Sequence, residues 1–437
     1  MVRGPRASRC LHGRPGSPGP LRTPYFARPP GTDRRTPTPR PAGEQPADDL
    51  HEGLRSMAEQ TSQDGDTPEN GEEARRARRI RPTGQRRRPR SRRRKILLAA
   101  AWTAAGGILV GGAGLGFAYV KLNGNLEGVD INAALGSDRP EEVDDGSLDL
   151  LVLGSDSRSG DNGKYGRDEG AARSDTAMIV HLHEGRKKAT VVSIPRDTLV
   201  TRPDCAAEDG STVSGGQRQM FNTAYEAGGP ACAVKTVEQM SGIRMDHYLE
   251  VDFSGFQEII DRLGGVEVTS GKAIDDDKSG LHLDKGTHTL DGEQSLGLVR
   301  TRHGVGDGSD LGRIQLQQTF LTALMHRVQD MGLLSSPKKL YGVADAATKS
   351  LTTDAELDSV PALLDFAQGL KGLKPEGMEM LTLPVEYDPA DANRVLPQEK
   401  AGAQVWKALR ADKAVPASAT EGSAGDKGDV DDVVSAG

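Results

Sequence analysis

The sequence predicts an α/β fold: an α/β/α layered domain with a mixed central sheet, preceded by one transmembrane helix. Three observations support this fold class. The stretch Ile96–Val120 contains no charged residue. After it, short apolar runs rich in β-branched residues alternate with segments whose apolar residues recur every three or four positions. The two ends of the chain, in contrast, are poor in apolar residues.

Both ends are predicted to be disordered. Residues 1–95 are rich in proline, glycine and arginine, and residues 411–437 consist mostly of alanine, serine, glycine and aspartate. Neither segment can bury enough apolar surface to offset the conformational entropy that ordering would cost. Met57 opens an acidic and then basic leader, which suggests the hypothesis that translation starts there and that residues 1–56 are not translated.

The stretch Ile96–Val120 is predicted to span a membrane. Its 25 residues rise about 1.5 Å each, which exceeds a hydrocarbon core of roughly 30 Å. The basic run Arg86–Lys95 directly precedes it, so the N-terminal arm should stay cytoplasmic and everything after Lys121 should lie outside. A buried core helix or a cleaved signal peptide is the alternative. The apolar run is too long for a signal peptide, however, and no A-x-A cleavage site follows it.

Charge is distributed unevenly along the chain. The net charge is −7, yet no acidic residue stands between Arg75 and Leu126. A basic arm and an acidic remainder, separated by one apolar stretch, are typical of a membrane protein. Nucleic-acid binding by the arm is an alternative, but the position of its basic residues beside a membrane helix explains them more simply.

A linker at residues 121–146 is predicted to lead into a domain at residues 147–410. Continuous apolar runs such as Leu148–Leu153 suit strands that are buried on both faces. The predicted strands are Leu148–Leu153, Thr176–Leu182, Ala189–Ile194, His247–Val251, Val266–Val268 and Met378–Leu383. Helical periodicity predicts helices at Cys232–Met240, Phe253–Leu263, Asp291–Leu298, Arg313–Gln329, Val343–Ala347 and Val360–Leu370.

Two of the three cysteines lie in the predicted external part. Cys10 belongs to the disordered arm, whereas Cys205 and Cys232 lie where an oxidising environment permits a disulfide. A metal site is the less favoured alternative, because no histidine or further cysteine stands at ligand spacing.

Four polar clusters stand at the ends of predicted strands or the starts of helices, where α/β folds place their sites. They are Gly154–Arg158, Arg173–Thr176, Ser193–Asp197, and Arg300–Arg302 with Asp310 and Arg313. Carboxylates without histidine or cysteine partners suit a hard cation such as Mg²⁺. Arginines suit a polyanion, because a guanidinium donates two parallel hydrogen bonds to phosphate. Each residue alone could be a helix cap or a surface charge, but arginine recurs in all four clusters. The clusters therefore predict a phosphate-binding, metal-assisted site.

Other common catalytic signatures are missing from the sequence. It contains no G-x-S-x-G elbow and no phosphate-binding P-loop motif. His181, His183 and His247 sit in or beside apolar strand segments, which favours core or surface roles over catalysis.

At these clusters the sequence resembles the LytR–CpsA–Psr family of cell-envelope proteins, and its glycine, arginine and alanine content resembles actinobacterial members. The resemblance covers most of residues 147–330 and continues more loosely to about residue 410. The motifs that carry it, in the order found in the family, are Leu150–Arg158 (LLVLGSDSR), Arg173–Thr176 (RSDT), Ser193–Asp197 (SIPRD), Phe221–Tyr225 (FNTAY), Asp246–Phe253 (DHYLEVDF), Leu263–Val266 (LGGV), Leu290–Glu293 (LDGE), Arg300–Arg302 (RTR) and Asp310–Gln318 (DLGRIQLQQ).

The resemblance implies an enzyme of cell-wall assembly. Family members bind polyprenyl pyrophosphate, with the lipid tail in an apolar tunnel. They are thought to transfer a phosphate-linked glycopolymer from this carrier to a peptidoglycan hydroxyl, with Mg²⁺ as cofactor. The layout of a short cytoplasmic arm, one signal-anchor helix and an extracellular domain in the cell membrane is also similar to the family's.

The resemblance also implies roles for individual residues. Asp156 and Asp175 would hold Mg²⁺, and Asp197 or Asp310 would orient an arginine or help to deprotonate the acceptor. The residues expected to act in catalysis are Asp156, Asp175, Arg196, Arg300 and Arg302. The residues expected to bind the pyrophosphate are Arg158, Arg173, Arg196, Arg300, Arg302, Arg313 and Gln317, with Gln318 as the alternative to Gln317. The family often carries an arginine where this chain has Leu316, so one phosphate contact is expected to be missing or supplied from elsewhere.

Two further functions are compatible with the same residues. A regulator that binds polyprenyl phosphates without turnover would not need Asp156. A lipid pyrophosphatase would use the same site with water in place of the acceptor hydroxyl. The expected partners are thus the lipid-linked glycan, peptidoglycan and the membrane, with no nucleic acid.

Overall fold

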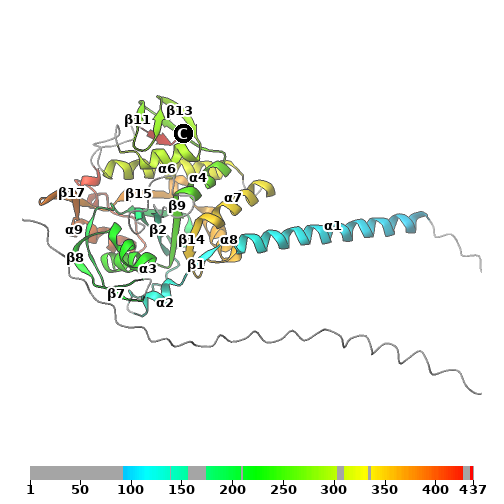
Figure 1. The fold of residues 1–437 in the computed structure, drawn as a ribbon, viewed down its shortest axis with the longest axis horizontal. Coiled ribbons are helices and arrows are strands. Elements are labelled where there is room, and N and C mark those ends of the chain that lie inside the picture. The colour runs from blue at the N-terminus through cyan, green and yellow to red at the C-terminus, as the bar shows by residue number, and fades with distance from the viewer. Residues whose placement is uncertain are drawn as a thin grey trace, which may run out of the picture. The chain divides into compact units, whose positions relative to one another are not determined.

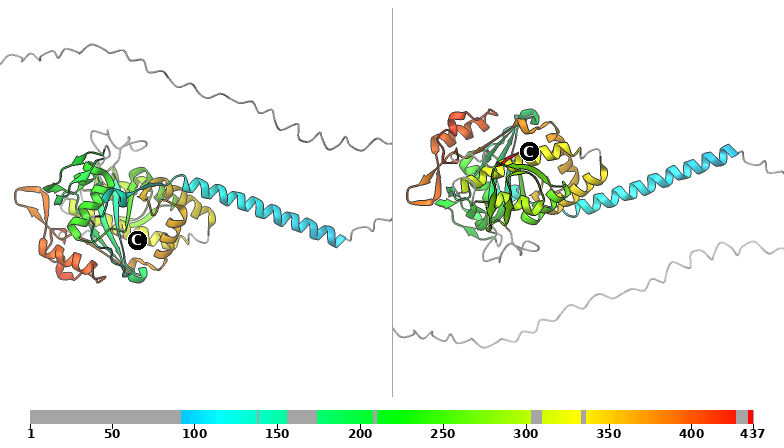
Figure 2. Two further views of the ribbon diagram at one scale, coloured as in Figure 1. Left: turned by 90° about the horizontal axis from the view of Figure 1, so that it is seen from below. Right: turned by 90° about the horizontal axis from the view of Figure 1, so that it is seen from above.

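The computed structural model describes residues 92–137, 139–155, 174–207, 210–302, 310–332, 336–426 and 434–436. At its centre lies a seven-stranded mixed sheet with helices on both faces, as Figures 1 and 2 show. The strands follow in the spatial order β1 (Glu127–Val129), β14 (Leu351–Asp354), β9 (His247–Asp252), β2 (Leu148–Ser155), β3 (Ser174–Leu182), β4 (Ala189–Ser193) and β15 (Met378–Thr382). The predicted fold class is therefore confirmed.

The direction of the strands brings the predicted polar clusters to one edge of the sheet. β2 and β9 run parallel, whereas β3 runs antiparallel to both β2 and β4. The end of β2, the start of β3 and the end of β4 therefore lie at the same edge. Ser155 pairs with Ser174, and Met178 pairs with Ser193.

Side chains from successive residues of β2 enter two different hydrophobic layers, because neighbouring strand residues point to opposite faces. Leu151 and Leu153 pack in one buried cluster with Val234 and Val237 of α3 (Asn222–Ser241). On the other face, Leu150 belongs to a cluster that includes Met325 and Phe366. These two residues lie on the helices α6 (Asp310–Asp330) and α8 (Val360–Gly369). The layers are thus helix, sheet and helix.

A second, smaller sheet packs against α6 (Figure 1). Its strands are β13 (Gly286–Leu290), β10 (Val266–Ser270) and β18 (Val434–Ala436). Together with α4 (Phe253–Arg262) and α5 (Gly292–Arg300) they enclose a separate hydrophobic cluster that includes Ile260, Leu298 and Leu316. α6 therefore lies between two hydrophobic clusters and is held on both sides.

The segment predicted as a linker at residues 121–146 is in fact part of the domain. α1 (Arg92–Asn123) is the one helix in the described residues that is long and apolar enough to cross a membrane. Only Gly124, Asn125 and Leu126 separate it from β1, which pairs in parallel with β14. α2 (Ile131–Leu135) then packs on α3. The polar composition of this segment concealed these contacts, because a three-residue edge strand needs few apolar side chains.

The disordered tail predicted from residue 411 is also corrected for the residues described there. Val415, Ala419 and Ala424 are buried in the same cluster as Leu151, and β18 pairs antiparallel with β10. The tail follows α9 (Glu399–Leu409), which the sequence analysis missed. Small side chains such as alanine bury little area each, so their composition alone did not reveal the packing. Residues 1–91 lie outside the described part of the chain.

The remaining predicted elements are present with shifted ends. α3 begins at Asn222, ten residues before the predicted start. Gly228 and Gly229 break its helical dihedral angles, so the predicted helix corresponds to the part after this break. α6 begins at Asp310 rather than Arg313. α7 (Pro337–Ser350) is longer than predicted.

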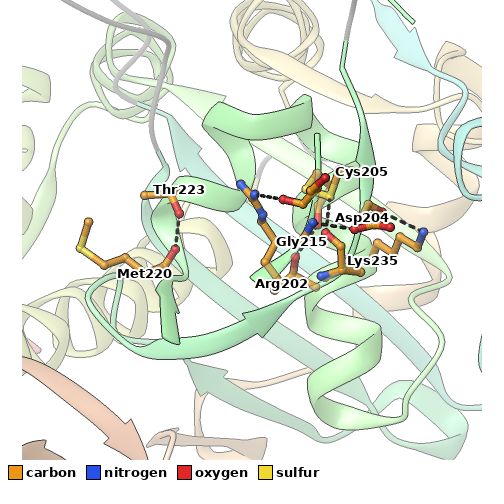
Figure 3. The surroundings of a disulfide bond; sticks show 11 residues. Arg202, Asp204, Cys205, Gly215, Met220, Thr223 and Lys235 are labelled. Atoms are coloured by element: carbon orange, nitrogen blue, oxygen red, sulfur yellow. Dashed lines mark hydrogen bonds between the residues drawn. A yellow bond between two sulfur atoms is a disulfide. The ribbon is translucent and has the colours of Figure 1, made fainter. Parts of the chain in front are cut away.

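Cys205 and Cys232 are joined as a disulfide, with their Cα atoms 5.4 Å apart (Figure 3). The bond ties β6 (Cys205–Ala206) to α3. Gly215 lies close by, and a side chain there would place its Cβ 2.3 Å from the carbonyl oxygen of Arg202. The Gly215 amide donates a hydrogen bond of 2.6 Å to Asp204.

Breaking this disulfide should destabilise the domain measurably. The bond closes a loop with a sequence separation of 27, for which the chain-entropy model gives about 3.5 kcal/mol. We expect Cys232→Ser, or reduction of wild type, to lower the free energy of unfolding by roughly 2–4 kcal/mol in denaturant titrations. Cys10→Ser is the control and should have no effect. Equal stability of oxidised and reduced wild type would contradict the expectation.

Candidate anion-binding site

In the described part of the chain, two strand ends and two helices form the candidate site. Asp175 lies at the start of β3, and Arg196 and Asp197 follow β4. Asp310 and Arg313 lie in the first turn of α6, and Arg300 ends α5. Asp156, Arg158 and Arg173 lie outside the described residues, as does most of the loop between β2 and β3.

α5 is positioned by its capping residues and by close packing. The Asp291 side chain accepts a hydrogen bond from the Gln294 amide, and the Gln294 side chain accepts one from the Asp291 amide, which completes a capping box. Gly292 allows the helix to approach α4, because a Cβ there would lie 2.4 Å from the carbonyl oxygen of Gln257. These local features fix the position of the C-terminal end of α5, where Arg300 ends the helix and Arg302 follows it.

Asp310 is the centre of a cluster of arginines. One of its oxygens, Oδ1, lies 2.6 Å from Arg313 Nη2 and 3.5 Å from Arg302 Nη2. The same oxygen lies 3.5 Å from Arg196 Nε. Three guanidinium groups thus meet at one carboxylate whose side chain is 13% exposed.

Arg196 extends the cluster toward two further carboxylates. Its Nη1 donates a hydrogen bond to Asp175, and its Nε lies 3.5 Å from Asp197 Oδ2. Arg394 of β17 (Asp391–Pro397) approaches Asp197 Oδ1 at 3.5 Å from the other side. Arg313 also donates a hydrogen bond of 2.9 Å to the backbone carbonyl of Asp175. Residues at the start of β3, after β4 and at the start of α6 are therefore in direct contact.

The pKa values of Arg196 and Arg313 shift in opposite directions. Burial opposes the charge of Arg196, but the carboxylates of Asp175, Asp310 and Asp197 outweigh it and raise the pKa. For Arg313, burial lowers the pKa, and the neighbouring guanidiniums of Arg302 and Arg196 add to this against the opposing effect of Asp310. The lowered pKa of Arg313 thus reflects its burial first and the two neighbouring guanidiniums second.

Several buried polar atoms of the cluster form no hydrogen bond within the described residues. They are Arg196 Nε, Arg313 Nε and both carboxylate oxygens of Asp310. The 2.6 Å contact between Asp310 and Arg313 is therefore a close ion pair without a well-directed N–H bond. Buried polar atoms are usually paired, so these donors and acceptors keep hydrogen-bonding capacity that the described residues do not use.

A cavity of about 240 Å³ opens beside the cluster. Its cationic lining consists of Lys278, Arg300, Arg302 and Arg313, and its acidic lining of Asp175 and Asp276. Phe253 contributes an apolar wall, with its ring centroid 5.1 Å from Arg300 Cζ. The cavity thus offers positive charge to an anionic group and an apolar surface beside it.

The structure separates the residues of the Asp310–Gln318 motif by the face of α6 on which they lie. Gln317 lines the cavity and donates hydrogen bonds to Thr176 Oγ1 (3.1 Å) and to the Val299 carbonyl (3.0 Å). Gln318 donates to Ser193 Oγ at 3.1 Å. Leu316 is fully buried in the hydrophobic cluster beside the small sheet. Leu316 is therefore not among the described residues that line the cavity.

Sequence reasoning missed three charged residues of the site: Asp276, Lys278 and Arg394. Asp276 and Lys278 belong to the hairpin of β11 (Ile274–Asp276) and β12 (Leu281–Leu283). Asp276 accepts a hydrogen bond of 3.1 Å from the Arg302 amide, which ties this hairpin to the site. The run of charges from Asp275 to Lys278 was visible in the sequence, but nothing in its spacing indicated that it meets Arg302.

The fold and the site define a layered α/β protein in which arginines and carboxylates converge beside a cavity with a cationic lining. Residues 118–411 match the model of the LytR_cpsA_psr family. The chain therefore belongs to the LytR–CpsA–Psr family, as the resemblance predicted.

Individual relatives show the same similarity. The chain is 32% identical over 302 residues to the cell wall biosynthesis protein LcpA of Corynebacterium glutamicum, covering 62% of this chain and 57% of LcpA. It thus spans little more than half the length of that relative. It is also 32% identical to the polyisoprenyl-teichoic acid–peptidoglycan teichoic acid transferase TagT of Bacillus subtilis, covering 70% of this chain and 91% of TagT. The crystal structure of B. subtilis TagV matches with 27% identity and a TM-score of 0.48, covering 62% of this chain and 98% of that one.

Proposed function

We propose that this protein transfers a phosphate-linked glycopolymer from a polyprenyl-pyrophosphate carrier to a hydroxyl group of peptidoglycan. The observation that carries the proposal is the convergence of Arg196, Arg302 and Arg313 on Asp310 beside a cationic cavity. TagT, whose name describes transfer of teichoic acid from a polyisoprenyl carrier to peptidoglycan, is a relative that matches most of the chain. In this proposal α1 anchors the protein in the cell membrane with residues 1–91 in the cytoplasm and the domain outside.

The arginines would bind the pyrophosphate and stabilise the phosphate that leaves. A guanidinium donates two parallel hydrogen bonds to phosphate oxygens, and Arg302 and Arg300 line the cavity where such a group fits. Charge that develops on the leaving polyprenyl phosphate would be neutralised by donors that are already in place. Asp310 would hold the guanidiniums in position, and Asp197 would take the proton of the acceptor hydroxyl.

We further propose Mg²⁺ as the cofactor. Mg²⁺ prefers oxygen ligands and is usually held by one or two carboxylates together with substrate phosphates. The donor set fits this ion, because Asp175 and Asp310 lie at the site and neither oxygen of Asp310 accepts a hydrogen bond within the described residues. Asp156 remains a proposed ligand from outside that part of the chain. When bound, the ion would neutralise charge on the phosphate oxygens.

The lipid tail would lie along the face of the sheet that carries Leu150. Several apolar side chains there are only partly buried, including Val180, Leu249, Met325 and Phe366. They would lose further contact with water if a polyprenyl chain packed against them, which favours binding by about 25 cal/mol per Å² of apolar surface.

The proposal is tested with the detergent-solubilised full-length protein, a synthetic polyprenyl-pyrophosphate glycan, peptidoglycan and Mg²⁺. We expect a phosphodiester-linked product and polyprenyl phosphate in equal amounts. EDTA should stop the reaction and added Mg²⁺ should restore it. Polyprenyl phosphate released at the same rate without peptidoglycan would instead indicate a lipid pyrophosphatase. Lipid binding without any product would indicate a binding protein.

A further inference from the structure

A cluster of two histidines and one aspartate lies at the other end of β3 from the anion-binding site. His181 is in β3, and His183 directly follows the strand. Because they are two residues apart, their side chains leave the strand on the same face. Asp412 approaches them from the segment after α9, and its φ of 48° puts it in the left-handed region. This conformation is uncommon for residues other than glycine and is tolerated best by aspartate and asparagine.

The three side chains direct their polar atoms at one point. Asp412 Oδ1 lies 3.1 Å from His181 Nε2 and 2.5 Å from His183 Nδ1. The two imidazole rings meet edge to face, with centroids 4.8 Å apart. All three ligand atoms lie within 4.8 Å of one another, which is close enough for one metal ion to contact all of them.

The other nitrogen of each ring has a partner of its own. His181 Nδ1 lies 2.9 Å from Asp149 Oδ1, and His183 Nε2 lies 3.0 Å from Thr190 Oγ1. In metal sites a ligating histidine almost always donates its second N–H to a carboxylate, carbonyl or similar acceptor. Asp149 therefore occupies the place of the carboxylate that orients a metal-bound imidazole.

Two carboxylates face the two ring nitrogens of His181, whose side chain is 1% exposed. A metal ion held between His181 Nε2 and Asp412 would offset the negative charge of Asp412 beside that of Asp149, and Asp149 would keep its contact with the other ring nitrogen.

We propose that His181, His183 and Asp412 bind a divalent transition-metal ion, with Zn²⁺ as the ion that fits best. Zn²⁺ accepts two imidazole nitrogens and a carboxylate oxygen in a tetrahedral site whose fourth position holds water. The side chains of His183 and Asp412 are 15% and 20% exposed, so water can reach that position. Mg²⁺ and Ca²⁺ are less suited, because they prefer oxygen ligands.

Such an ion would fasten the C-terminal segment to the main sheet. Asp412 lies immediately beyond the residues that match the family model, which end at 411. The segment then continues to Gly425, whose carbonyl accepts a hydrogen bond of 3.2 Å from Gln315 on α6. The metal would therefore fix the start of a segment that reaches the helix carrying Arg313, without itself lying in the anion-binding site.

The test uses untagged full-length protein in detergent, with Zn²⁺ as the probe and calorimetry and elemental analysis as readouts. We expect one Zn²⁺ per wild-type chain. Thr190→Val should weaken binding roughly 10- to 100-fold, as loss of an outer partner typically does. His183→Gln and Asp412→Asn remove a ligand from partly exposed positions and should weaken it further. The control is His282→Gln, because His282 pairs with Asp275 on an exposed hairpin and should leave the affinity unchanged.

A second measurement needs no variant. Hydrogen exchange of residues 411–426 in wild type should slow when Zn²⁺ is added. For amides that exchange only after Asp412 is released, the exchange rate should fall about 100-fold at a Zn²⁺ concentration 100 times the Kd. The proposal is overturned if wild type binds no Zn²⁺ stoichiometrically. It is equally overturned if His183→Gln and Asp412→Asn bind Zn²⁺ as tightly as wild type does, since the ion would then lie elsewhere.

Discussion

The Arg302→Ala variant is expected to transfer glycopolymer about 100- to 1,000-fold more slowly than wild type while keeping its fold, the range found when one preorganised donor to a developing charge is removed. The Arg302 guanidinium lines the cavity and lies 3.5 Å from Asp310, but its side chain is 32% exposed. The amide that binds Asp276 belongs to the backbone and survives the substitution. The loss should therefore fall on chemistry rather than on stability.

Steady-state kinetics in the transfer assay can locate the defect. A fall in kcat with an unchanged KM means that Arg302 stabilises mainly the transition state. A rise in KM alone means that Arg302 stabilises the bound substrate and the transition state equally. The matched control is Arg262→Ala, because Arg262 is 51% exposed and pairs with Glu258 on the surface of α4. Arg302→Ala protein that works as fast as the Arg262→Ala control would place Arg302 outside the site.

Asp310→Asn is expected to have the largest effect on stability. It removes the charge shared by Arg196, Arg302 and Arg313, of which Arg313 is only 5% exposed. Removing one partner of a buried ion pair typically costs roughly 3–5 kcal/mol, because the remaining charge stays buried without compensation. We expect a clearly lower Tm in thermal unfolding.

The same substitution should tighten the binding of inorganic pyrophosphate when no Mg²⁺ is present. With one negative charge removed, the three guanidiniums present a larger net positive charge to an anion. Added pyrophosphate should therefore raise the Tm of Asp310→Asn more than that of wild type. Asp391→Asn is the control, since Asp391 is 46% exposed and lies 3.9 Å from Arg394. If the Tm and the pyrophosphate response of Asp310→Asn both match wild type, Asp310 does not organise the cluster.

The central sheet could be predicted from the sequence because its inner strands are apolar on both faces and end abruptly in polar residues. β2, β3 and β4 all follow this pattern, and it led directly to Asp175 and Arg196. β14 (LTTD) could not be recognised in this way. Three of its four residues are threonine or aspartate, and Asp354 accepts a hydrogen bond of 2.9 Å from the Tyr248 amide.

The parts of the site that depend on long-range packing could not be predicted. Arg394 and Lys278 lie on hairpins whose positions are set by contacts with distant strands and helices, so their spacing along the chain carried no signal. His181 and His183 were assigned to core or surface roles, and the structure places both in or beside a buried strand. Their shared contact with Asp412 joins residues about 230 positions apart, which no local pattern can reveal.

The direct passage from α1 into β1 limits where this protein can work. Three residues, at no more than about 3.5 Å each, allow β1 to begin only about 10–14 Å from the end of α1. Lys121 and Asp345 form an ion pair of 2.9 Å across the same junction, and Asn123 accepts a hydrogen bond from the Val360 amide. A long flexible tether would let a domain sample a deep volume above the lipid surface. With α1 in the cell membrane as proposed, a domain attached so closely would sample a thin layer along the bilayer. The proposed transfer would then modify acceptor strands within that layer in preference to those in older, more distant wall.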